Sequence, residues 1–445
     1  MTTQVSTADG AVAAILPTMG VALRGKTAAA VGWHDASAGP SANSDATRDT
    51  RREPLDIAAV QRALRDEGLD GWLLYDFQGS NPIARRVAGL QTAGKLTTRR
   101  WYYLIPVVGA PRGLVHAIER DRLDHLPGDK TRYSERGELD VGLRALLSGR
   151  ATVAMEFSPG CAIPYVSRVD AGTVDAIRAL GVEVRSSGDL VQRFEATWSA
   201  AALASHEAAS RALYEIKDRA FDFVSQRMRG GDSITEFEVQ DAMAGWFKQE
   251  GLVSDSRPVV AAQENAGDPH YLPTGERHRI IGRDEVLLLD LWGKLATDGA
   301  VYADITWMGY TGTPVPARYA EAFAVIREGR DAAVSLVRQS IHDGRGLRGW
   351  EVDRRTRNLI AAAGFGDRFV HRTGHSLGED VHGNGAHLDD FETRDERRLL
   401  PGTGVTVEPG LYFEDFGLRT EINLHVGPAS ATVTGPAQTE IRTLG

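Results

Sequence analysis

The chain has 445 residues, more than one ordinary hydrophobic core accommodates, so two structured domains are expected. Its 42% hydrophobic and 25% charged residues are typical of a globular protein, and no apolar run approaches the roughly 20 residues that span a bilayer. The net charge of -9 opposes binding to phosphate backbones. We therefore expect a soluble protein with neither a membrane nor a nucleic acid as partner.

The cysteine content limits both the compartment and the metal chemistry. A single cysteine, Cys161, excludes an internal disulfide bond and a cage of thiolates around a metal ion. This usage is typical of a reducing compartment, so we predict a cytoplasmic protein. Any metal site must then use oxygen and imidazole ligands.

Residues 1–53 are rich in Ala, Gly, Ser and Thr and show neither helical nor strand periodicity, so we predict a disordered or loosely attached extension. After it, the helix-like segment IAAVQRALRDEGL precedes a series of strand-like segments, with a further helix-like stretch near residues 170–180. The strand-like segments read GWLLYDF, WYYLIPV, GLVHAIE, ATVAMEF and VEVRSS. Strands that alternate with helices predict an α/β domain at residues 54–195.

The remaining part, residues 196–445, begins with a strongly helical pattern from about Ser199. Ser233 and Glu236 match the spacing of a capping box, which predicts a second helix there. A third amphipathic helix is predicted within Tyr319–Ile341. Each helical zone is followed by strands punctuated by glycine, so we expect two similar units, each of helices and a sheet.

Two carboxylates interrupt apolar strands in this part. Asp290 lies in EVLLLDLW and Asp304 in VYADITW, with a turn containing TDG between them. The two strands are expected to form a hairpin with both carboxylates on one face. Desolvated carboxylates side by side repel and become protonated unless a cation neutralises them, so the pair indicates a metal site.

A similar pair recurs near the end of the chain. Glu408 in GVTVEPGLYF and Glu421 in LRTEINLHV flank a turn at EDFG and are expected on neighbouring strands. Between the two hairpins lies FVHRTGHSLGEDVHGNGAHL, a glycine-rich stretch that contains His371, His375, His382 and His387. A single acid or histidine is ordinarily a cap, an ion pair or a polar contact, whereas this whole set favours metal or acid–base chemistry.

The composition of the set narrows the choice of metal. Four carboxylates and an imidazole suit manganese, cobalt, iron or zinc, and a shared carboxylate can bridge two ions about 3.5–4 Å apart. Two such ions provide a bridging hydroxide at neutral pH, which can attack an amide carbonyl.

These residues carry a resemblance to a known family. The chain resembles the pita-bread (M24-type) metallopeptidases, namely Xaa-Pro dipeptidases (prolidases), aminopeptidase P and methionine aminopeptidases. The resemblance extends from about Ser199 to the end and rests on the texts HRTGHSLG, VEPGLYF and GLRTEINL and on the order Asp290, Asp304, His375, Glu408, Glu421. It implies an α+β protein with a pita-bread catalytic domain at residues 196–445. The α/β domain before it looks like a creatinase-type N-terminal domain, which argues against a methionine aminopeptidase.

The resemblance implies two divalent metal ions, with manganese expected first and cobalt, zinc or iron as alternatives. Asp290 would bind one ion, Asp304 and Glu421 would bridge both, and His375 and Glu408 would hold the other. Glu408 also matches the acid that carries a proton from the nucleophilic water to the leaving imino nitrogen.

Further residues match the family's substrate contacts. His270, His371 and His382 match histidines that face the substrate, and Arg419 and Tyr412 match residues that orient the carboxylate ligands. Two departures stand out. The loop LATDGA makes the gap between the first two ligands longer than usual, and VHGNGAHL stands where prolidases often have His-Glu after the metal histidine.

The activity implied is hydrolysis of Xaa-Pro bonds, with dipeptides as the first expectation and a homodimer as the assembly. Aminopeptidase P activity on longer peptides with proline at the second position is one alternative, and a non-peptide pita-bread hydrolase or lyase is another. All five ligands are present, which argues against a metal-free creatine-type enzyme and against a relative that binds without catalysis. Leu291 and Trp292 follow the first ligand, where the lyases carry an additional Asp.

Overall fold

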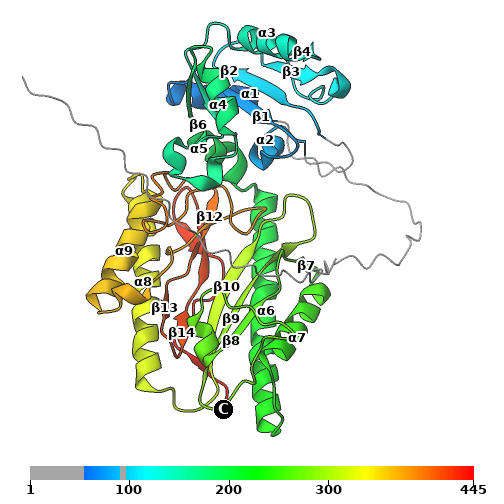
Figure 1. Ribbon diagram of the computed structural model, residues 1–445. Helices are drawn as coiled ribbons and strands as arrows, with labels where there is room; N and C mark the ends of the chain where they lie inside the picture. The colour runs from blue at the N-terminus through cyan, green and yellow to red at the C-terminus, as the bar shows by residue number, and fades with distance from the viewer. Residues whose placement is uncertain (1–54, 91–96) are drawn as a thin grey trace, which may run out of the picture. The chain divides into compact units, whose positions relative to one another are not determined.

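The computed structural model describes residues 55–90 and 97–445 (Figure 1). The extension predicted at residues 1–53 lies outside these ranges. Within them, no helix combines the length and the apolar character needed to cross a membrane.

The first part of the described chain contains a six-stranded mixed sheet in the order β4-β3-β2-β1-β5-β6. Strand β1 is antiparallel to β2 and parallel to β5. The strands are β1 Gly71–Asp76, β2 Trp101–Pro106, β3 Arg112–His116, β4 Asp129–Tyr133, β5 Thr152–Met155 and β6 Glu183–Ser186.

Helices cover both faces of this sheet. The helices α1 (Ile57–Asp66) and α2 (Pro82–Val87) pack on one face, and α3 (Arg136–Leu147) and α4 (Ala171–Arg178) pack on the other. Because both faces are buried, β1 and β2 read as continuous apolar runs rather than as alternating ones. The predicted α/β character is therefore present, whereas the boundary predicted at residue 195 stays a prediction.

Short elements connect the larger ones. A helical turn, α5 (Gly188–Val191), continues into a π-helical turn, η4 (Gln192–Ala196), before the long helix α6 (Ala200–Arg229). The Ser199 hydroxyl caps α6 by accepting the Ala202 N–H at 3.1 Å. Single 3₁₀ turns lie at η1 Ala117–Glu119, η2 Pro159–Cys161, η3 Pro164–Val166, η5 Gln263–Gly267 and η6 Gly366–Arg368.

The start of helix α7 (Glu236–Gln249) differs from the predicted capping box. Thr235, not Ser233, is the N-cap, and Glu238 completes the box by accepting the Thr235 N–H at 2.8 Å. A β-bridge between Thr235 and Ile280 keeps Thr235 extended, so the helix begins two residues later than the first matching pair suggests. Glu236 is thereby free for other contacts.

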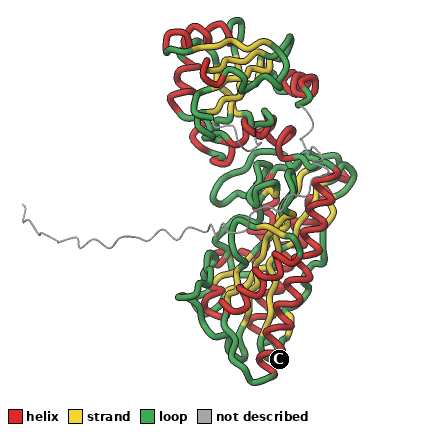
Figure 2. The backbone as a smooth tube through the Cα atoms, turned by 90° about the vertical axis from the view of Figure 1, so that its right-hand side faces the viewer, coloured by secondary structure: helices red, strands yellow, loops and turns green. Residues whose placement is uncertain are grey.

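The second part contains two units of paired helices and a sheet. In the first, α6 and α7 pack through one apolar cluster against a sheet in the order β17-β10-β9-β7, with β8 also paired to β9 (Figures 1 and 2). The strands are β7 Leu252–Val253, β8 Val259–Ala262, β9 Val286–Leu295, β10 Ala303–Tyr310 and β17 Arg442–Thr443.

In the second unit, α8 (Ala317–His342) and α9 (Gly349–Ala362) accompany a sheet in the order β11-β12-β15-β16, whose members contribute to a further apolar cluster. The strands are β11 Ser376–Leu377, β12 Thr403–Val407, β15 Ile422–Val426 and β16 Ala431–Val433, with a separate hairpin of β13 Gly410–Tyr412 and β14 Gly417–Arg419. The structure therefore has the two helix-plus-sheet units that the sequence pattern predicted.

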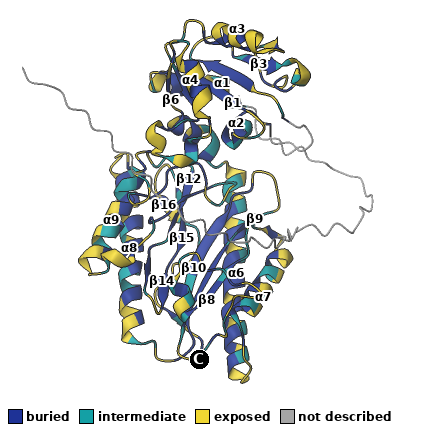
Figure 3. Ribbon diagram, viewed as in Figure 1, coloured by how far each residue is buried: buried dark blue, intermediate teal, exposed yellow. Residues whose placement is uncertain are grey.

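Hydrogen bonds join the two sheets at the place where the predicted ligands lie. The Asp304 N–H donates to Asn423 Oδ1 at 3.0 Å, and the Glu421 N–H donates to Thr306 O at 3.1 Å. Figure 3 shows β9, β10 and β15 as mostly buried strands. The site is thus set in buried backbone that hydrogen bonds join across the two sheets.

Candidate metal centre

The hairpin of β9 and β10 places the first two carboxylates on one face. In its register, Asp290 pairs with Thr306 and Asp304 pairs with Trp292. Side chains alternate along a strand, so Asp304 and Thr306 share a face, and Asp290 joins them as the cross-strand partner of Thr306. The predicted hairpin with both carboxylates on one face is confirmed.

The second acidic pair lies just beyond its strands. The last pairing of β12 with β15 is Val407 with Ile422, so Glu408 follows one strand and Glu421 precedes the other. The expectation that both glutamates lie on neighbouring strands is therefore off by one residue each. Between them, β13 and β14 form their own hairpin, which turns Arg419 back toward the carboxylates.

Three of the predicted ligands form a compact, buried cluster. Asp304, His375 and Glu421 each offer a ligand atom, and these atoms all lie within 4.8 Å of one another. Glu408 adjoins this cluster, with Oε1 3.6 Å from His375 Nε2. Asp290 is connected to Glu421 through the Thr306 hydroxyl.

The charge of Arg419 offsets only part of the repulsion among the carboxylates of the cluster. Within residues 55–90 and 97–445, Asp304 Oδ1 and Glu421 Oε1 are buried without a hydrogen-bond partner. Burial first, and then the neighbouring carboxylates, raise the pKa of Asp304 and of Glu421 well above their usual values. Such a cluster must take up either protons or cations, and its orphaned oxygens are the ligand type that divalent ions prefer.

His375 gives a second reason to place a cation here. Its Nδ1 lies 3.1 Å from Ser376 O, so this nitrogen carries the proton and donates it to the carbonyl. The Nε2 lone pair then faces Asp304 Oδ2 at 3.5 Å and Glu408 Oε1 at 3.6 Å. A lone pair opposite two anionic oxygens is repulsive, whereas a metal ion between the three atoms would bind all of them. The donor set therefore fits a divalent metal.

Thr306 lies between two of the carboxylates. Its hydroxyl is 3.0 Å from Asp290 Oδ1 and 2.7 Å from Glu421 Oε2, and it accepts the Arg419 Nε–H at 2.9 Å. A hydroxyl has a single proton, so Thr306 satisfies only one of the two carboxylates at a time. Asp290 is also paired with Arg419, so Glu421 is the carboxylate left without a donor when the hydroxyl turns to Asp290.

Arg419 begins a chain of hydrogen bonds with a fixed direction. Its Nη2 donates to Asp290 Oδ2, and its Nη1 donates to the Tyr412 hydroxyl at 3.1 Å. His371 Nδ1 lies 2.8 Å from Arg372 O and so carries the proton, which leaves Nε2 to accept the Tyr412 O–H at 2.8 Å. Burial, and then the charge of Arg419, lower the pKa of His371 to about 3, so the ring is neutral.

The three histidines predicted to face the substrate have different surroundings. His371 uses both ring nitrogens within the protein, whereas His382 packs its ring edge against His375 at a centroid distance of 4.4 Å. His270 is exposed, on the segment between β8 and β9. Its charge, after burial and Arg372, contributes to lowering the pKa of His382 to about 4. His270 is therefore near His382 but outside the compact cluster.

Sequence reasoning missed three polar residues of the centre. Thr306 bridges carboxylates, Asn423 accepts the Asp304 N–H, and the Thr406 hydroxyl accepts the His375 N–H at 2.9 Å and lies 3.2 Å from Glu408 Oε1. Thr306 and Thr406 each stand two residues from a predicted ligand. Strand alternation alone could have placed Thr306 on the same face as its neighbour.

The fold is that of a metallopeptidase of the pita-bread type, and the cluster that it positions could hold a metal ion. Residues 201–428, half of the chain, match the model of the family described as Metallopeptidase family M24. The chain therefore belongs to that family. It is also similar to the Uncharacterized peptidase YqhT of Bacillus subtilis, with 32% identity over 213 residues, 46% of this chain and 54% of the relative. The Xaa-Pro dipeptidase of Lactobacillus helveticus is 31% identical over 199 residues, 43% of this chain and 50% of the relative. The chain thus spans about half the length of the curated relatives it matches.

Solved structures extend the likeness in fold to most of the chain. The dipeptidase PepE of Mycobacterium ulcerans aligns with a TM-score of 0.67 at 22% identity, over 87% of this chain and 96% of that one. An X-prolyl aminopeptidase of Caenorhabditis elegans, described as a cytosolic enzyme with a di-nuclear active site, aligns with a TM-score of 0.59 at 19% identity, over 86% and 62%. The predicted α+β pita-bread fold is confirmed.

Proposed function

We propose that this chain is a metal-dependent peptidase that hydrolyses Xaa-Pro bonds, with dipeptides as its first substrates. The observation that carries the metal is the cluster in which the His375 Nε2 lone pair faces two carboxylates. The substrate class rests on the similarity to relatives such as the Lactobacillus helveticus Xaa-Pro dipeptidase.

Five residues would hold two divalent ions, with manganese first and cobalt, zinc or iron as alternatives. They are Asp290, Asp304, His375, Glu408 and Glu421. When bound, the two cations supply an activated water at neutral pH and stabilise negative charge on the carbonyl oxygen of the substrate. The ion pair between Arg419 and Asp290 orients one of the carboxylates for this task.

The proton carrier is Glu408. Its side chain remains 15% exposed, against 8% for Asp304, so it is the more accessible of these two carboxylates for a substrate. The Thr406 hydroxyl, 3.2 Å from Glu408 Oε1, holds that oxygen toward His375. Glu408 would accept a proton from the attacking water and deliver it to the imino nitrogen of the leaving proline.

His382 and His270 would contact the substrate from the open side of the cluster. His371 has a different role in this chain. Because its Nε2 accepts the Tyr412 O–H, it orients the tyrosine hydroxyl, which then stands beside Arg419. The proposed protein is cytoplasmic and forms a homodimer. Light scattering of the purified protein tests the dimer.

The decisive experiment is release of proline from a panel of Xaa-Pro dipeptides and Xaa-Pro-Yaa tripeptides. The protein is stripped of metal and reloaded with manganese, cobalt or zinc, and bound metal is measured in parallel. Metal-dependent cleavage of dipeptides alone is expected. Cleavage of tripeptides would shift the activity to that of aminopeptidase P. Two bound ions without cleavage of any peptide would refute the peptidase and point to non-peptide chemistry.

A further inference from the structure

Glu236 is a buried carboxylate that the proposed chemistry does not use. It is the first residue of α7, and its relative exposure is 0%. Burying a carboxylate is costly unless hydrogen bonds replace the lost water. Capping does not explain this buried carboxylate, since Thr235 and Glu238 already form the cap.

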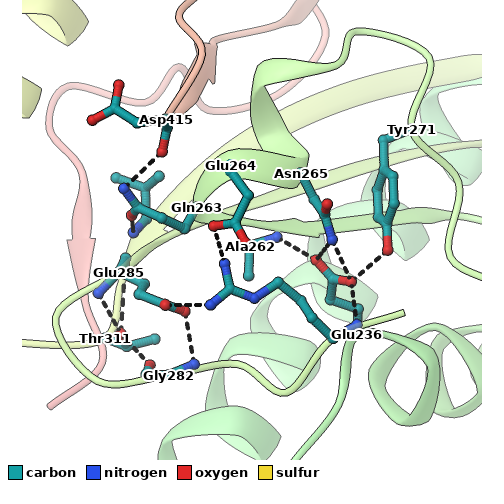
Figure 4. A network of polar contacts seen from close by, with 12 residues as sticks. Glu236, Ala262, Gln263, Glu264, Asn265, Tyr271, Gly282, Glu285, Thr311 and Asp415 are labelled. Atoms are coloured by element: carbon teal, nitrogen blue, oxygen red, sulfur yellow. Dashed lines mark hydrogen bonds and ion pairs between the residues drawn. The ribbon is translucent and has the colours of Figure 1, made fainter. Parts of the chain in front are cut away.

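Four donors surround the Glu236 carboxylate (Figure 4). The Ala262 N–H donates to Oε1 at 2.7 Å, and the Tyr271 hydroxyl donates to Oε2 at 2.6 Å. The Asn265 amide contacts both oxygens at 3.0 Å, and the Arg279 N–H donates to Oε2 at 3.0 Å. Hydrogen bonds to a carboxylate are stronger than hydrogen bonds between neutral groups, so Glu236 holds these four donors in place.

Three of the four donors come from one segment, residues 262–271, which begins at the last residue of β8 and contains the turn η5. Glu236 binds this segment at its start through Ala262, in its middle through Asn265 and at its end through Tyr271. Figure 4 shows the Ala262 backbone and the side chains of Asn265 and Tyr271 meeting at Glu236. A single carboxylate thus fixes the segment at three points.

The opposite side of the segment lies directly on the hairpin that carries Tyr412 and Arg419. A Cβ built on Gly267 would come within 2.3 Å of Phe413 O, and one built on Gly417 within 1.8 Å of Ala266 O. Such close approach requires glycine at both positions. The segment is therefore held between Glu236 on one side and the β13–β14 hairpin on the other.

His270 occupies the end of this held segment. It stands directly before Tyr271, and its N–H donates to Asp268 Oδ1 at 3.0 Å. Its neighbours Asp268 and Pro269 line a small cavity together with Tyr412 and Arg419. His270 is thus placed beside the metal centre by a segment whose conformation depends on Glu236.

We propose that Glu236 is a positioning residue that fixes the 262–271 segment so that His270 points at the substrate. This inference rests on the proposed function, because His270 acts on a substrate only if the centre hydrolyses peptides. Glu236 touches no reacting atom and works only through the segment it holds.

Glu236→Gln is the informative substitution. The amide has nearly the same size, but one of its two ends donates and cannot accept the N–H groups that now surround both oxygens. We expect the segment to shift and kcat for the manganese-loaded enzyme on Ala-Pro to fall roughly tenfold to a hundredfold, since small misplacement of a contact group costs about this much. Bound manganese is expected to stay at the wild-type amount.

The matched control is Glu238→Gln, the same chemical change on the same turn of helix. Glu238 is exposed and accepts the Thr235 N–H and hydroxyl, so this variant weakens the cap of α7 without touching the segment. We expect its kcat within about twofold of wild type, in line with the small effect of an exposed cap away from the site. A similar loss in both variants would show that α7 stability alone matters.

A double-mutant cycle with His270→Ala decides whether Glu236 acts through the histidine. If it does, Glu236→Gln causes little further loss of kcat in the His270→Ala background. Equal fold losses in both backgrounds would overturn the inference while leaving the proposed function intact.

Hydrogen–deuterium exchange gives a readout that needs no substrate. Faster exchange of residues 262–271 is expected in Glu236→Gln and not in Glu238→Gln. Unchanged exchange in residues 262–271 would overturn the positioning role, whether or not the protein cleaves peptides. Absence of peptide cleavage would instead overturn the proposed function, so the two failures are distinguishable. Tyr271→Phe, which removes one hydrogen bond and keeps the ring, provides a milder variant if Glu236→Gln folds poorly.

Discussion

The strongest test of the metal centre is the substitution Asp304→Asn in the absence and presence of metal. The substitution keeps the shape of the side chain and removes its negative charge. The ligand atoms of this cluster lie within 4.8 Å of one another. Two full charges at that separation repel by about 3.5 kcal/mol at an effective dielectric constant of 20. The raised pKa of Asp304 means that protons already relieve part of this repulsion in the metal-free protein. We therefore expect Asp304→Asn to stabilise the metal-free protein by about 1–3 kcal/mol.

Bound metal should make the wild type more stable than Asp304→Asn, which reverses their order in the metal-free state. A ligand at a hundred times its Kd stabilises the folded protein by about 2.7 kcal/mol, and the wild type is expected to gain at least this with manganese. The variant lacks an anionic ligand and is expected to gain little. Thermal unfolding of both proteins, once with a chelator and once with manganese, measures the effect. We expect Asp304→Asn to unfold roughly 1–3 °C above the wild type with chelator, and below it with manganese.

Asp298→Asn is the matched control, because Asp298 is an exposed acid in the loop between the same two strands. It is expected to leave both melting temperatures unchanged. The reasoning is refuted if Asp304→Asn destabilises the metal-free protein, or if manganese does not raise the melting temperature of the wild type.

Three further predictions concern single side chains. Thr306→Val keeps the shape of the side chain but removes the hydroxyl between two carboxylates. We expect manganese affinity, measured by calorimetric titration, to fall roughly tenfold to a hundredfold. An unchanged affinity would argue against a role for the hydroxyl. His382→Ala is expected to keep the metal content of the wild type and to lower dipeptide turnover, whereas a loss of metal would make His382 a ligand. His206 is buried between Tyr302 O and the Thr434 hydroxyl, each 2.7 Å away, and burial lowers its pKa to about 4. The unfolded chain takes up this proton near pH 6.5 and the folded one only near pH 4, so stability falls as pH falls through this window, by about 2 kcal/mol at pH 5. Urea unfolding at pH 7.5 and pH 5 should show a loss about 2 kcal/mol larger in the wild type than in His206→Gln, which keeps the other buried histidines. Equal losses in both would contradict the assignment.

Much of the fold could be predicted because its signals are local. The apolar spacing within Tyr319–Ile341 predicts α8, and the carboxylates within apolar runs predict strands that must share a buried face. The chemical types of the predicted ligands also follow from the sequence, since buried acids without partners require a cation or a proton. These features depend on residues within a few positions of one another.

The sequence by itself determined the longest helices, several of the strands, the acidic hairpin and the family resemblance. Tertiary structure alone decided which polar groups meet. Glu236 fits a capping box with Ser233 by spacing, yet it faces inward and binds residues 26 to 43 positions away, while Thr235 caps the helix. His371 pairs with Tyr412, 41 residues away, and Thr306 reaches Glu421, 115 residues away. The physical reason is that caps and amphipathic faces are set by neighbours in the chain, whereas the partners of a buried polar side chain are set by how distant segments pack.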